Sequence, residues 1–469
     1  MSWLEDTITY DKRVPLGAIY DDKSVFVHLH RLFENFITVG AGFHESWLGQ
    51  FGLTEKDFTL PVDRSRFAKS WKLASSKQFA DFVKGSPRRK FLLYGPLDPP
   101  YRINPLSYIM NSPTIAHAYE HKRYFRDEFS DLINMPEYVV LKLDDLTGHM
   151  YAELRARFDG KFVVQEVESS GSKGTFIISK RVDYDRAVAS LRNTSYSATV
   201  VVSRFVKGLP CSVQVCITKY GIFTGGLQNQ LVSSKYLCKQ PKADAPAGEA
   251  LTEQWCGGEL GGPVSEIVKH RIQEIATVVG SELASHGYRG IFGIDLLVTP
   301  ESEVYAIEVN ARLTGYTHIL SDIQYAKQKI PFILLHTLEL GNYKYEVNDL
   351  DALANMTSLD EKFSYVIIHN ISNELFKIPT NIKVGLYRID GDQLTFVKQS
   401  YTVEDIKDDK SVLIFCKWPK GHKVPSGKRI IKFVKRGKCM AANGELDVKT
   451  QRQVQIIKNA FNLPDVKVD

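Results

Sequence analysis

The clearest pattern of apolar and polar positions begins near residue 119 and predicts alternating helices and strands. Over residues 263–287 a long helix is expected, because Ile267, Ile272 and Leu283 fall on the 3.6-residue period and Gly287 can end it. Upstream, the pattern predicts a helix at Glu120–Leu132 and strands at Tyr138–Leu143, Lys161–Val167, Thr175–Ser179, Ala198–Val206 and Cys211–Thr218. Downstream, it predicts strands at Ile291–Val298 and Val304–Asn310, then short strands and a final helix near Gln451–Phe461.

The first hundred residues carry a weaker pattern. Val25–Leu29 and Phe91–Tyr94 are typical of short strands, and Arg66–Lys84 is typical of a helix. The prolines of Gly95–Pro100 exclude regular structure there, because each removes a backbone donor and fixes φ. Lys239–Glu249 lacks hydrophobic periodicity and holds two prolines, so we expect an exposed loop.

Length and composition are those of a globular protein. The 469 residues, 43% of them hydrophobic and 24% charged, are enough for roughly two to four domains. No apolar run approaches the roughly 18 residues of a membrane-spanning helix, and Met1–Arg13 does not resemble a secretory signal. The six cysteines show neither a Cys-x-x-Cys pair nor zinc spacing, which favours free thiols in a reducing compartment. We therefore expect a cytoplasmic protein with no membrane partner.

The net charge of +6 is distributed unevenly. Nine basic residues and no acidic ones lie between Lys417 and Lys438, so the rest of the chain is net negative. This distribution argues against nucleic-acid binding over the whole surface, and the basic strip lacks an RNA-stacking motif. We expect the strip to be a solvated strand face or to attract anionic substrates.

Two acidic residues interrupt the apolar strands within Gly290–Gly315. A hairpin symmetric about residues 301 and 302 places Asp295 opposite Glu308, where the two carboxylates repel unless they share a proton or hold a cation. Asn310 shares a face with Glu308, and Arg312 can bring a fixed positive charge to the same place. Oxygen ligands of this kind suit magnesium with phosphate. Either acidic residue taken alone would instead be typical of a solvated strand edge.

A loop of small residues, Ser169–Gly174, joins two predicted strands. Its glycines and serines let consecutive backbone N–H groups point at a phosphate, although a tight hairpin turn is the alternative. The loop matches neither a Gly-x-Gly-x-x-Gly motif that opens a helix nor a phosphate loop ending in Gly-Lys-Ser/Thr. The two common nucleotide-binding folds are therefore not indicated.

The order of these features resembles the ATP-grasp superfamily from about Tyr119 to Gly341. That family runs as a lysine opening a helix, a strand ending in lysine, a Gly-rich flap, an adenine-binding connector, a helix, and paired acidic strands ending Glu-x-Asn-x-Arg. The resemblance implies an α/β (α+β) ATP-grasp fold. Its core would occupy residues 116–345, between an N-terminal α/β domain at 1–115 and a small, mostly-β C-terminal domain at 346–469.

The resemblance also implies site residues, at the positions that match the family pattern. Lys122 opens the first helix of the pattern, although alone it would be typical of a polar helix face. The residues implied in ATP binding are Lys122, Gln165, Gly171, Ser172, Lys173, Gly174, Ser203, Arg204, Phe205 and Val206. The implied ligands of Mg²⁺ or Mn²⁺ are Asp295, Glu308 and Asn310, and the implied catalytic residues are Arg312 and Asn310.

Two positions depart from the family pattern. Gln165 stands where a strand normally ends in lysine, and it can donate hydrogen bonds to a phosphate without neutralising it. Either another cation such as Lys173 substitutes, or the chain belongs to a branch that uses glutamine. Ser203 stands where an acidic residue usually accepts from the adenine amino group.

The resemblance implies a carboxylate–amine ligase that uses ATP and Mg²⁺, passes through an acyl phosphate and releases ADP and phosphate. Its partners would be small-molecule carboxylate and amine substrates, such as amino acids or peptides, and by family habit it would be a homodimer. The C-terminal region favours the L-amino-acid and peptide ligase branch. A biotin-carboxylase-like enzyme is the alternative, less favoured because no Met-Lys-Met site is present. An ATP-binding sensor or scaffold without turnover is a third hypothesis, against which the complete acidic set argues.

Overall fold

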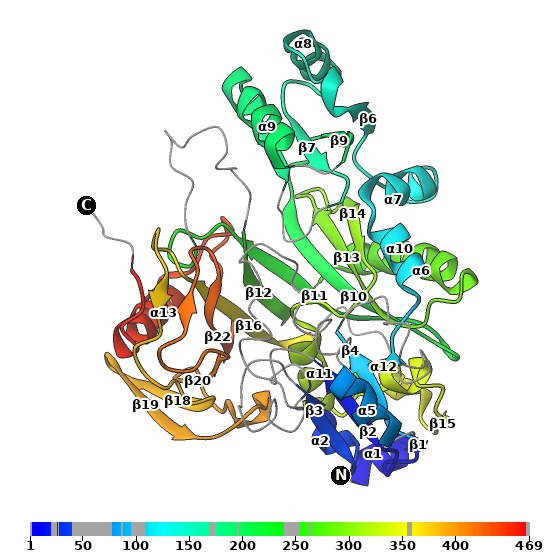
Figure 1. Cartoon of the computed structure of the whole chain (residues 1–469), viewed down its shortest axis with the longest axis vertical. Coiled ribbons are helices and arrows are strands. Elements are labelled where there is room, and N and C mark those ends of the chain that lie inside the picture. Colours follow the sequence, from blue (N-terminus) through cyan, green and yellow to red (C-terminus); the bar gives the residue numbers. More distant parts are fainter. Residues whose placement is uncertain are drawn as a thin grey trace.

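A computed structural model gives the arrangement of the chain (Figure 1). It describes residues 2–19, 26, 28–39, 77–85, 88–94, 108–168, 174–194, 197–238, 254–262, 264–353 and 359–465. The predicted loop Lys239–Glu249 and the proline-rich Gly95–Pro100 lie outside the described residues. Three sheets, with four, four and ten strands, carry the architecture.

The N-terminal elements form a parallel sheet of strand order β3-β2-β4-β5. Its elements are strands β2 (Leu16–Ile19), β3 (Phe36–Val39), β4 (Lys90–Leu93) and β5 (Tyr108–Ile109) and helices α1 (Ser2–Thr7), α2 (Leu29–Leu32) and α5 (Lys77–Gly85). Strand β4 confirms the strand predicted near Phe91, and α5 falls at the end of the helix predicted from Arg66. The strand predicted over Val25–Leu29 is wrong at Leu29, which begins α2. Leu29 and Leu32 are both buried, and a helix brings residues three apart onto one face.

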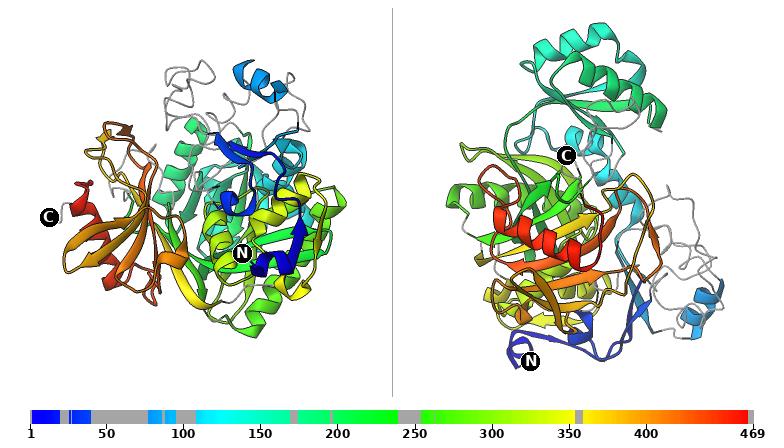
Figure 2. Two further views of the ribbon diagram at one scale, coloured as in Figure 1. Left: turned by 90° about the horizontal axis from the view of Figure 1, so that it is seen from below. Right: turned by 90° about the vertical axis from the view of Figure 1, so that its left-hand side faces the viewer.

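An antiparallel sheet of order β6-β9-β7-β8 forms a lobe at one end of the molecule (Figures 1 and 2). The lobe consists of strands β6 (Tyr138–Lys142), β7 (Phe162–Glu166), β8 (Thr175–Ile178) and β9 (Thr199–Arg204), the short helix η4 (Leu143–Asp145), and helices α8 (Gly148–Arg157) and α9 (Arg181–Thr194). The four predicted strands are confirmed, each end within two residues. Phe162, Tyr184 and Val202 are buried in the core of the lobe, between its sheet and its helices.

Helices α6 (Pro113–Glu120) and α7 (Lys122–Phe129) lead into the lobe. The sequence predicted one helix from Glu120, but the chain forms two helices that meet at His121. The His121 backbone is extended, and its side chain caps α7 by accepting from the Tyr124 N–H at 3.3 Å. The N–H of Lys122 donates to the Val167 carbonyl at 3.0 Å, so the start of α7 is attached to the chain just after β7.

A ten-stranded sheet of order β14-β13-β10-β11-β12-β16-β22-β20-β18-β19 forms the centre of the molecule. Its strands are β10 (Leu209–Thr218), β11 (Gly221–Val232), β12 (Trp255–Gly262), β13 (Gly290–Val298), β14 (Val304–Asn310), β16 (Leu359–His369), β18 (Gly385–Asp390), β19 (Gln393–Lys398), β20 (Ser411–Cys416) and β22 (Arg429–Arg436). Every neighbouring pair in it is antiparallel. Strands β12 and β16 pair across the predicted domain boundary at residue 345, so the sheet is continuous from the core into the C-terminal region.

Helices and short elements surround this sheet. They are α10 (Glu266–Ser285), α11 (Thr317–Ala326), α12 (Phe332–Leu340), α13 (Val448–Ala460), η5 (Leu350–Leu353) and η6 (Val403–Asp405), with β17 (Phe376–Lys377) paired to β21 (Lys423–Val424) and β1 (Ile8–Tyr10) paired to β15 (Tyr345–Val347). Helix α10 confirms the helix predicted from periodicity, and α13 confirms the final helix predicted near Gln451–Phe461. Among the described residues, no helix combines the length and the hydropathy that crossing a membrane requires.

The basic strip between Lys417 and Lys438 includes β22, a strand covered by neighbours. Strand β22 lies between β16 and β20, and Lys432 and Lys435 are each only 2% exposed. The Lys435 ammonium donates to the Lys438 carbonyl at 2.8 Å and to the Thr450 hydroxyl at 2.9 Å. The expectation of a solvated strand face is therefore wrong for β22. A strand inside a sheet that is covered on both faces gives no clean alternation that would reveal its burial.

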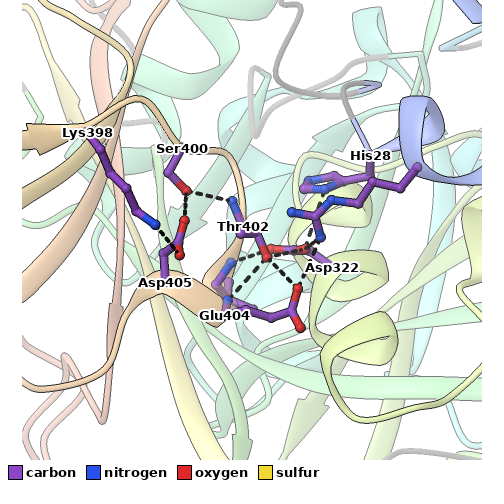
Figure 3. Close-up of polar contacts among 9 residues, drawn as sticks. His28, Asp322, Lys398, Ser400, Thr402, Glu404 and Asp405 are labelled. Carbon is purple, nitrogen blue, oxygen red and sulfur yellow. Dashed lines mark hydrogen bonds and ion pairs between the residues drawn. The ribbon is translucent and has the colours of Figure 1, made fainter. Parts of the chain in front are cut away.

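One buried carboxylate joins three parts of the chain (Figure 3). Asp322 on α11 is 1% exposed; its Oδ2 accepts from the Val403 N–H at 2.6 Å and its Oδ1 from the Thr402 hydroxyl at 3.1 Å. His28 Nδ1 lies 3.4 Å and Arg31 Nη1 3.7 Å from the same carboxylate. Asp322 therefore links α11 of the central part to α2 of the N-terminal sheet and to η6 of the C-terminal region.

Candidate functional site

The predicted acidic pair lies at one edge of the ten-stranded sheet. Asp295 on β13 is directly opposite Glu308 on β14, as predicted, but the hairpin below them is not symmetric about residues 301 and 302. Val298 pairs with Val304, and the register shifts by one residue between Asp295 and Leu296. Ile307 is the extra residue of this bulge, so the bulge is what brings the two carboxylates opposite each other.

Amide and guanidinium groups hold this pair in place. Asp295 accepts from Gln230 Nε2 on β11 at 3.0 Å and from Asn310 Nδ2 at 3.2 Å. The Asn310 carbonyl accepts in turn from Arg312 Nη2 at 2.6 Å, and Arg312 Nε lies 3.1 Å from Glu120 Oε1. Four of the predicted residues, Asp295, Glu308, Asn310 and Arg312, are thus brought together.

Lys122 joins the same cluster from helix α7. Its Nζ lies 3.4 Å from Glu308 Oε2, and its side chain is 4% exposed whereas that of Glu308 is 27% exposed. Because α6 ends at Glu120 and His121 caps α7, Lys122 is the first residue of α7, where its ammonium lies beside Glu308 of β14. The structure thus places Lys122 beside the acidic strands, and its role in ATP binding stays a prediction.

The two carboxylates differ in their electrostatic surroundings. Burial, and then the charge of Glu308, raises the pKa of Asp295 well above that of an ordinary carboxyl. Burial acts on Glu308 in the same direction, but Lys122, the hydrogen bond with Asp295 and Arg312 together outweigh it and lower the pKa of Glu308. The pair therefore holds one charge more readily than two.

This donor set fits a magnesium ion. Within the described part of the chain, no group of three or more His, Cys, Asp or Glu side chains is placed to hold a metal. Asp295 and Glu308 with the Asn310 carbonyl offer oxygen donors only, which suits a cation that keeps waters and takes phosphate oxygens as its remaining ligands. Two facing carboxylates that resist double ionisation are also the arrangement that a divalent cation stabilises.

Gln165, the departure from the lysine pattern, has a partner that the sequence did not suggest. Its Oε1 accepts from Arg126 Nη2 at 2.8 Å, and its Nε2 lies 3.4 Å from Thr175 Oγ1 at the start of β8. Arg126 is one turn beyond Lys122 on α7 and is 1% exposed. The signal in the sequence was the four-residue spacing between the two cations, which puts both on one helix face.

The flap is described only at its end. Gly171, Ser172 and Lys173 lie outside the described residues, whereas Gly174 closes the β7–β8 hairpin by accepting from the Glu166 N–H at 2.9 Å. Gly174 has a φ of +66°, and a Cβ there would lie 2.7 Å from Glu166 Oε2 and 2.8 Å from Glu166 Cβ. This position therefore requires glycine both for its conformation and for space.

The predicted adenine connector continues from β9. Ser203 is 3% exposed and pairs with Tyr138 and Val163 in the lobe sheet. Arg204 Nη2 donates to Glu137 Oε2 at 2.9 Å, so this side chain has acidic partners of its own. Phe205 lies beneath the Lys161 ammonium, whose Nζ is 3.6 Å from the ring centroid, and Val206 is partly exposed. A role in ATP binding stays a prediction for all four connector residues.

Sequence reasoning missed two residues of the cluster, Gln230 and Arg126. Gln230 lies on β11, two strands from β13 in the sheet, and nothing local in its sequence links it to Asp295. Two histidines of the central part, His318 and His117, take no part in the contacts of the cluster described above and differ in their surroundings. His318 is 2% exposed and packs edge-on against Tyr365, whereas His117 lies in the last turn of α6.

Comparison with known proteins finds a family match for the central segment of the chain. Residues 120–316 match the family model of the ATP-grasp domain. A curated relative, the butirosin acyl-carrier-protein–L-glutamate ligase of Niallia circulans, is 25% identical over 191 residues. That alignment covers 39% of this chain and 41% of the relative, so the chain matches less than half of the relative's length.

Solved structures share the fold over most of the chain. The biotin carboxylase domain of 2-oxoglutarate carboxylase from Hydrogenobacter thermophilus matches with a TM-score of 0.57 and 9% identity, covering 90% of this chain and 86% of that one. Phosphoribosylamine–glycine ligase from Thermotoga maritima gives 0.55 and 13%, with 95% and 96% covered. L-amino acid ligase from Bacillus licheniformis gives 0.51 and 14%, with 91% and 94% covered. The mixed α/β architecture expected from the sequence is thus confirmed.

Proposed function

The chain carries an ATP-grasp domain at residues 120–316, and from that premise we propose that it is an ATP-dependent carboxylate–amine ligase. The reaction would join a small carboxylate to an amine through an acyl phosphate and release ADP and phosphate. The main support is the convergence of two facing carboxylates, Asp295 and Glu308, with Asn310, Arg312 and Lys122 in one site.

The cations of the site suit a polyphosphate. Lys122 and Arg312 approach the acidic pair from different elements, α7 and the segment after β14. A triphosphate and a carboxylate repel each other, and fixed positive charges offset that repulsion without having to reorganise during the reaction. Arg312 presents a planar fork of donors that can hold phosphate oxygens in a defined orientation.

The first step forms the acyl phosphate. A carboxylate oxygen of the substrate attacks the γ-phosphorus of ATP, the bond to the β–γ bridging oxygen breaks, and ADP leaves with that electron pair. Asp295, Glu308 and Asn310 would hold Mg²⁺, which screens the phosphate charges when bound. Lys122 and Arg312 would bind the oxygens on which charge accumulates.

The second step forms the amide. The amine attacks the acyl carbon, loses a proton and expels phosphate, so the chain needs no side-chain nucleophile of its own. The acyl phosphate is sensitive to water, and we assign the role of covering it to the β7–β8 hairpin, in which Gly174 directly precedes β8.

Amino acids are the substrates we propose first. The relative from Niallia circulans is named for L-glutamate and an acyl-carrier protein, and one structural neighbour is an L-amino acid ligase. A substrate screen should therefore contain free amino acids, dipeptides and, as a separate arm, an acyl-carrier protein with L-glutamate. Bicarbonate with free biotin tests the carboxylase-like alternative.

In the experiment, the full chain is incubated with ATP, Mg²⁺ and each of these substrate pools in turn. The nucleotide products are measured, and mass spectrometry detects any amide formed from the pool. ADP and phosphate should appear only with a productive pool. Glu308→Gln should abolish turnover in a folded protein, whereas Glu303→Gln, in the turn of the same hairpin and 43% exposed, should leave it unchanged. Release of AMP and pyrophosphate would contradict the acyl-phosphate route. ATP binding with no product from any pool would support a sensor instead.

A further inference from the structure

Arg126 is a fully buried cation beside the proposed nucleotide site. It is 1% exposed, and its guanidinium donates from Nη2 to Gln165 Oε1 at 2.8 Å and from Nη1 to the Lys122 carbonyl at 3.3 Å. Both acceptors are neutral. Its Nε is buried and has no hydrogen-bond partner among the described residues.

The charge of Arg126 is not balanced by a direct ion pair within the described part of the chain. Burial lowers the pKa of Arg126 to about 10, against the opposing influence of Glu308, so the group stays charged at neutral pH. A buried charge with only neutral partners is unfavourable, and a methionine would fill the space without that penalty. The guanidinium is therefore better explained by an anion that binds there than by packing.

The position of Arg126 indicates which anion. Lys122 and Arg126 lie four residues apart on α7, and the charge of Glu308 acts on both. Gln165, which holds the guanidinium, is on β7 at the strand position where the family pattern has a lysine, and its amide also reaches Thr175 beside the end of the flap.

We propose that Arg126 is a phosphate-binding residue for ATP and replaces the missing strand lysine, with Gln165 positioning its guanidinium. The assignment rests on the proposed ATP-dependent function. It also answers the question that the sequence left open between Lys173 and a glutamine-using branch. In this assignment Gln165 accepts a hydrogen bond from Arg126, and the positive charge comes from helix α7 instead of the strand.

The test measures binding by calorimetric titration of the full chain with MgATP and, separately, with adenosine. Arg126→Met should weaken MgATP affinity about 10- to 100-fold, the range of a charge-assisted hydrogen bond, and change adenosine affinity less than about 2-fold. Adding Gln165→Lys to Arg126→Met restores a cation on the strand and should recover MgATP affinity to within about 5-fold of the wild type.

Matched variants separate this role from a structural one. Arg123→Met removes a cation of the same helix that is 51% exposed and paired with Asp127, and it should leave both affinities unchanged. Lys173→Met should weaken MgATP binding less than Arg126→Met does. A larger effect of Lys173→Met, equal losses of MgATP and adenosine in Arg126→Met, or a folded double variant without recovery would each overturn the assignment.

If Arg126→Met alone does not fold, the double variant with Gln165→Lys still tests the proposal. Recovery of both folding and MgATP affinity in the double variant would show that a strand lysine can replace Arg126. Failure of this inference differs from failure of the proposed function. If the wild type binds MgATP and forms amide while Arg126→Met binds equally well, only the role of Arg126 is wrong. If the wild type binds neither ATP nor ADP, the ligase proposal fails and the assignment of Arg126 fails with it.

Discussion

Asp295 and Glu308 face each other across the β13–β14 ladder, yet only Asp295 has its carboxyl pKa raised, to about 7. Glu308 has Lys122 at 3.4 Å, and Asp295 has the amides of Gln230 and Asn310. Because the Lys122 ammonium lies beside Glu308, Glu308 stays ionised and the proton that the pair shares resides on Asp295. At the proposed metal site, this asymmetry should make metal binding depend on pH, because a divalent cation would have to displace that proton.

Binding of MgATP should release a proton near neutral pH. Below about pH 7 Asp295 is protonated in the free protein and ionised in the complex, so affinity should rise with pH through that value and level off above it. Titration calorimetry at pH 6 in two buffers of different ionisation enthalpy should detect close to one released proton. At pH 8.5 the release should be near zero. The same release at both pH values would contradict the asymmetric pair.

Gln230→Leu should weaken metal binding without touching a proposed ligand. The variant removes the hydrogen bond that Gln230 Nε2 donates to Asp295 Oδ1, so the ionised carboxylate loses support and the pKa of Asp295 should rise further. Loss of an orienting partner of this kind typically costs about 10- to 100-fold in metal affinity. Mg²⁺ titration at fixed ATP measures the loss, which should shrink as the pH is raised. An affinity equal to that of the wild type at pH 6 would mean that Gln230 has no part in the site.

Gly174→Ala should affect both folding and the use of ATP. The left-handed backbone and the approach of Glu166 make alanine unfavourable there by about 1 kcal/mol or more. Gly160→Ala is the matched control, since Gly160 has a φ of +92° but nothing within 4 Å of a Cβ. Both variants should lower the free energy of unfolding, and only Gly174→Ala should raise the KM for ATP. Equal KM values in the two variants would argue against a role for the hairpin in covering the nucleotide.

The fold could be predicted best where periodicity is strong and elements are local. The strands of the lobe and helices α10 and α13 follow from their own residues. The pairing of β12 with β16 could not be predicted, because it joins segments about a hundred residues apart and depends on tertiary contacts. Burial of Lys432 was missed for the same reason: its neighbours on β16 and β20 come from elsewhere in the chain.

The candidate site could be predicted in part. The prediction that Asp295 lies opposite Glu308 came from assuming a short symmetric hairpin. The assumed pairing is wrong by one residue near the turn, but the bulge at Ile307 shifts the register back, so the predicted pair is still formed. The partner of Gln165 could not be predicted from the strand, since Arg126 reaches it from a helix 39 residues away. A cation on helix α7 that stands in for a lysine on strand β7 can be recognised only when the positions of both elements in the structure are known.

The carboxylate of Asp322 should be essential for joining the C-terminal region to the rest of the chain. Asp322→Ala leaves the Val403 N–H and the Thr402 hydroxyl without their buried acceptor and should lower the free energy of unfolding by about 2–4 kcal/mol. Asp405→Ala is the control on the same segment. Asp405 is 24% exposed, pairs with Lys398 and accepts from the Ser400 hydroxyl at 2.5 Å, so its loss should cost about 1 kcal/mol, less than that of Asp322. Burial raises the pKa of Asp322, so ionisation of this carboxyl opposes folding. The free energy of unfolding of the wild type should therefore fall, relative to that of Asp322→Asn, as the pH rises above the ordinary carboxyl range. Urea unfolding of the wild type and the three variants at pH 4.5 and 7.5 measures both effects. Equal losses for Asp322→Ala and Asp405→Ala would contradict the central role of Asp322 in the junction.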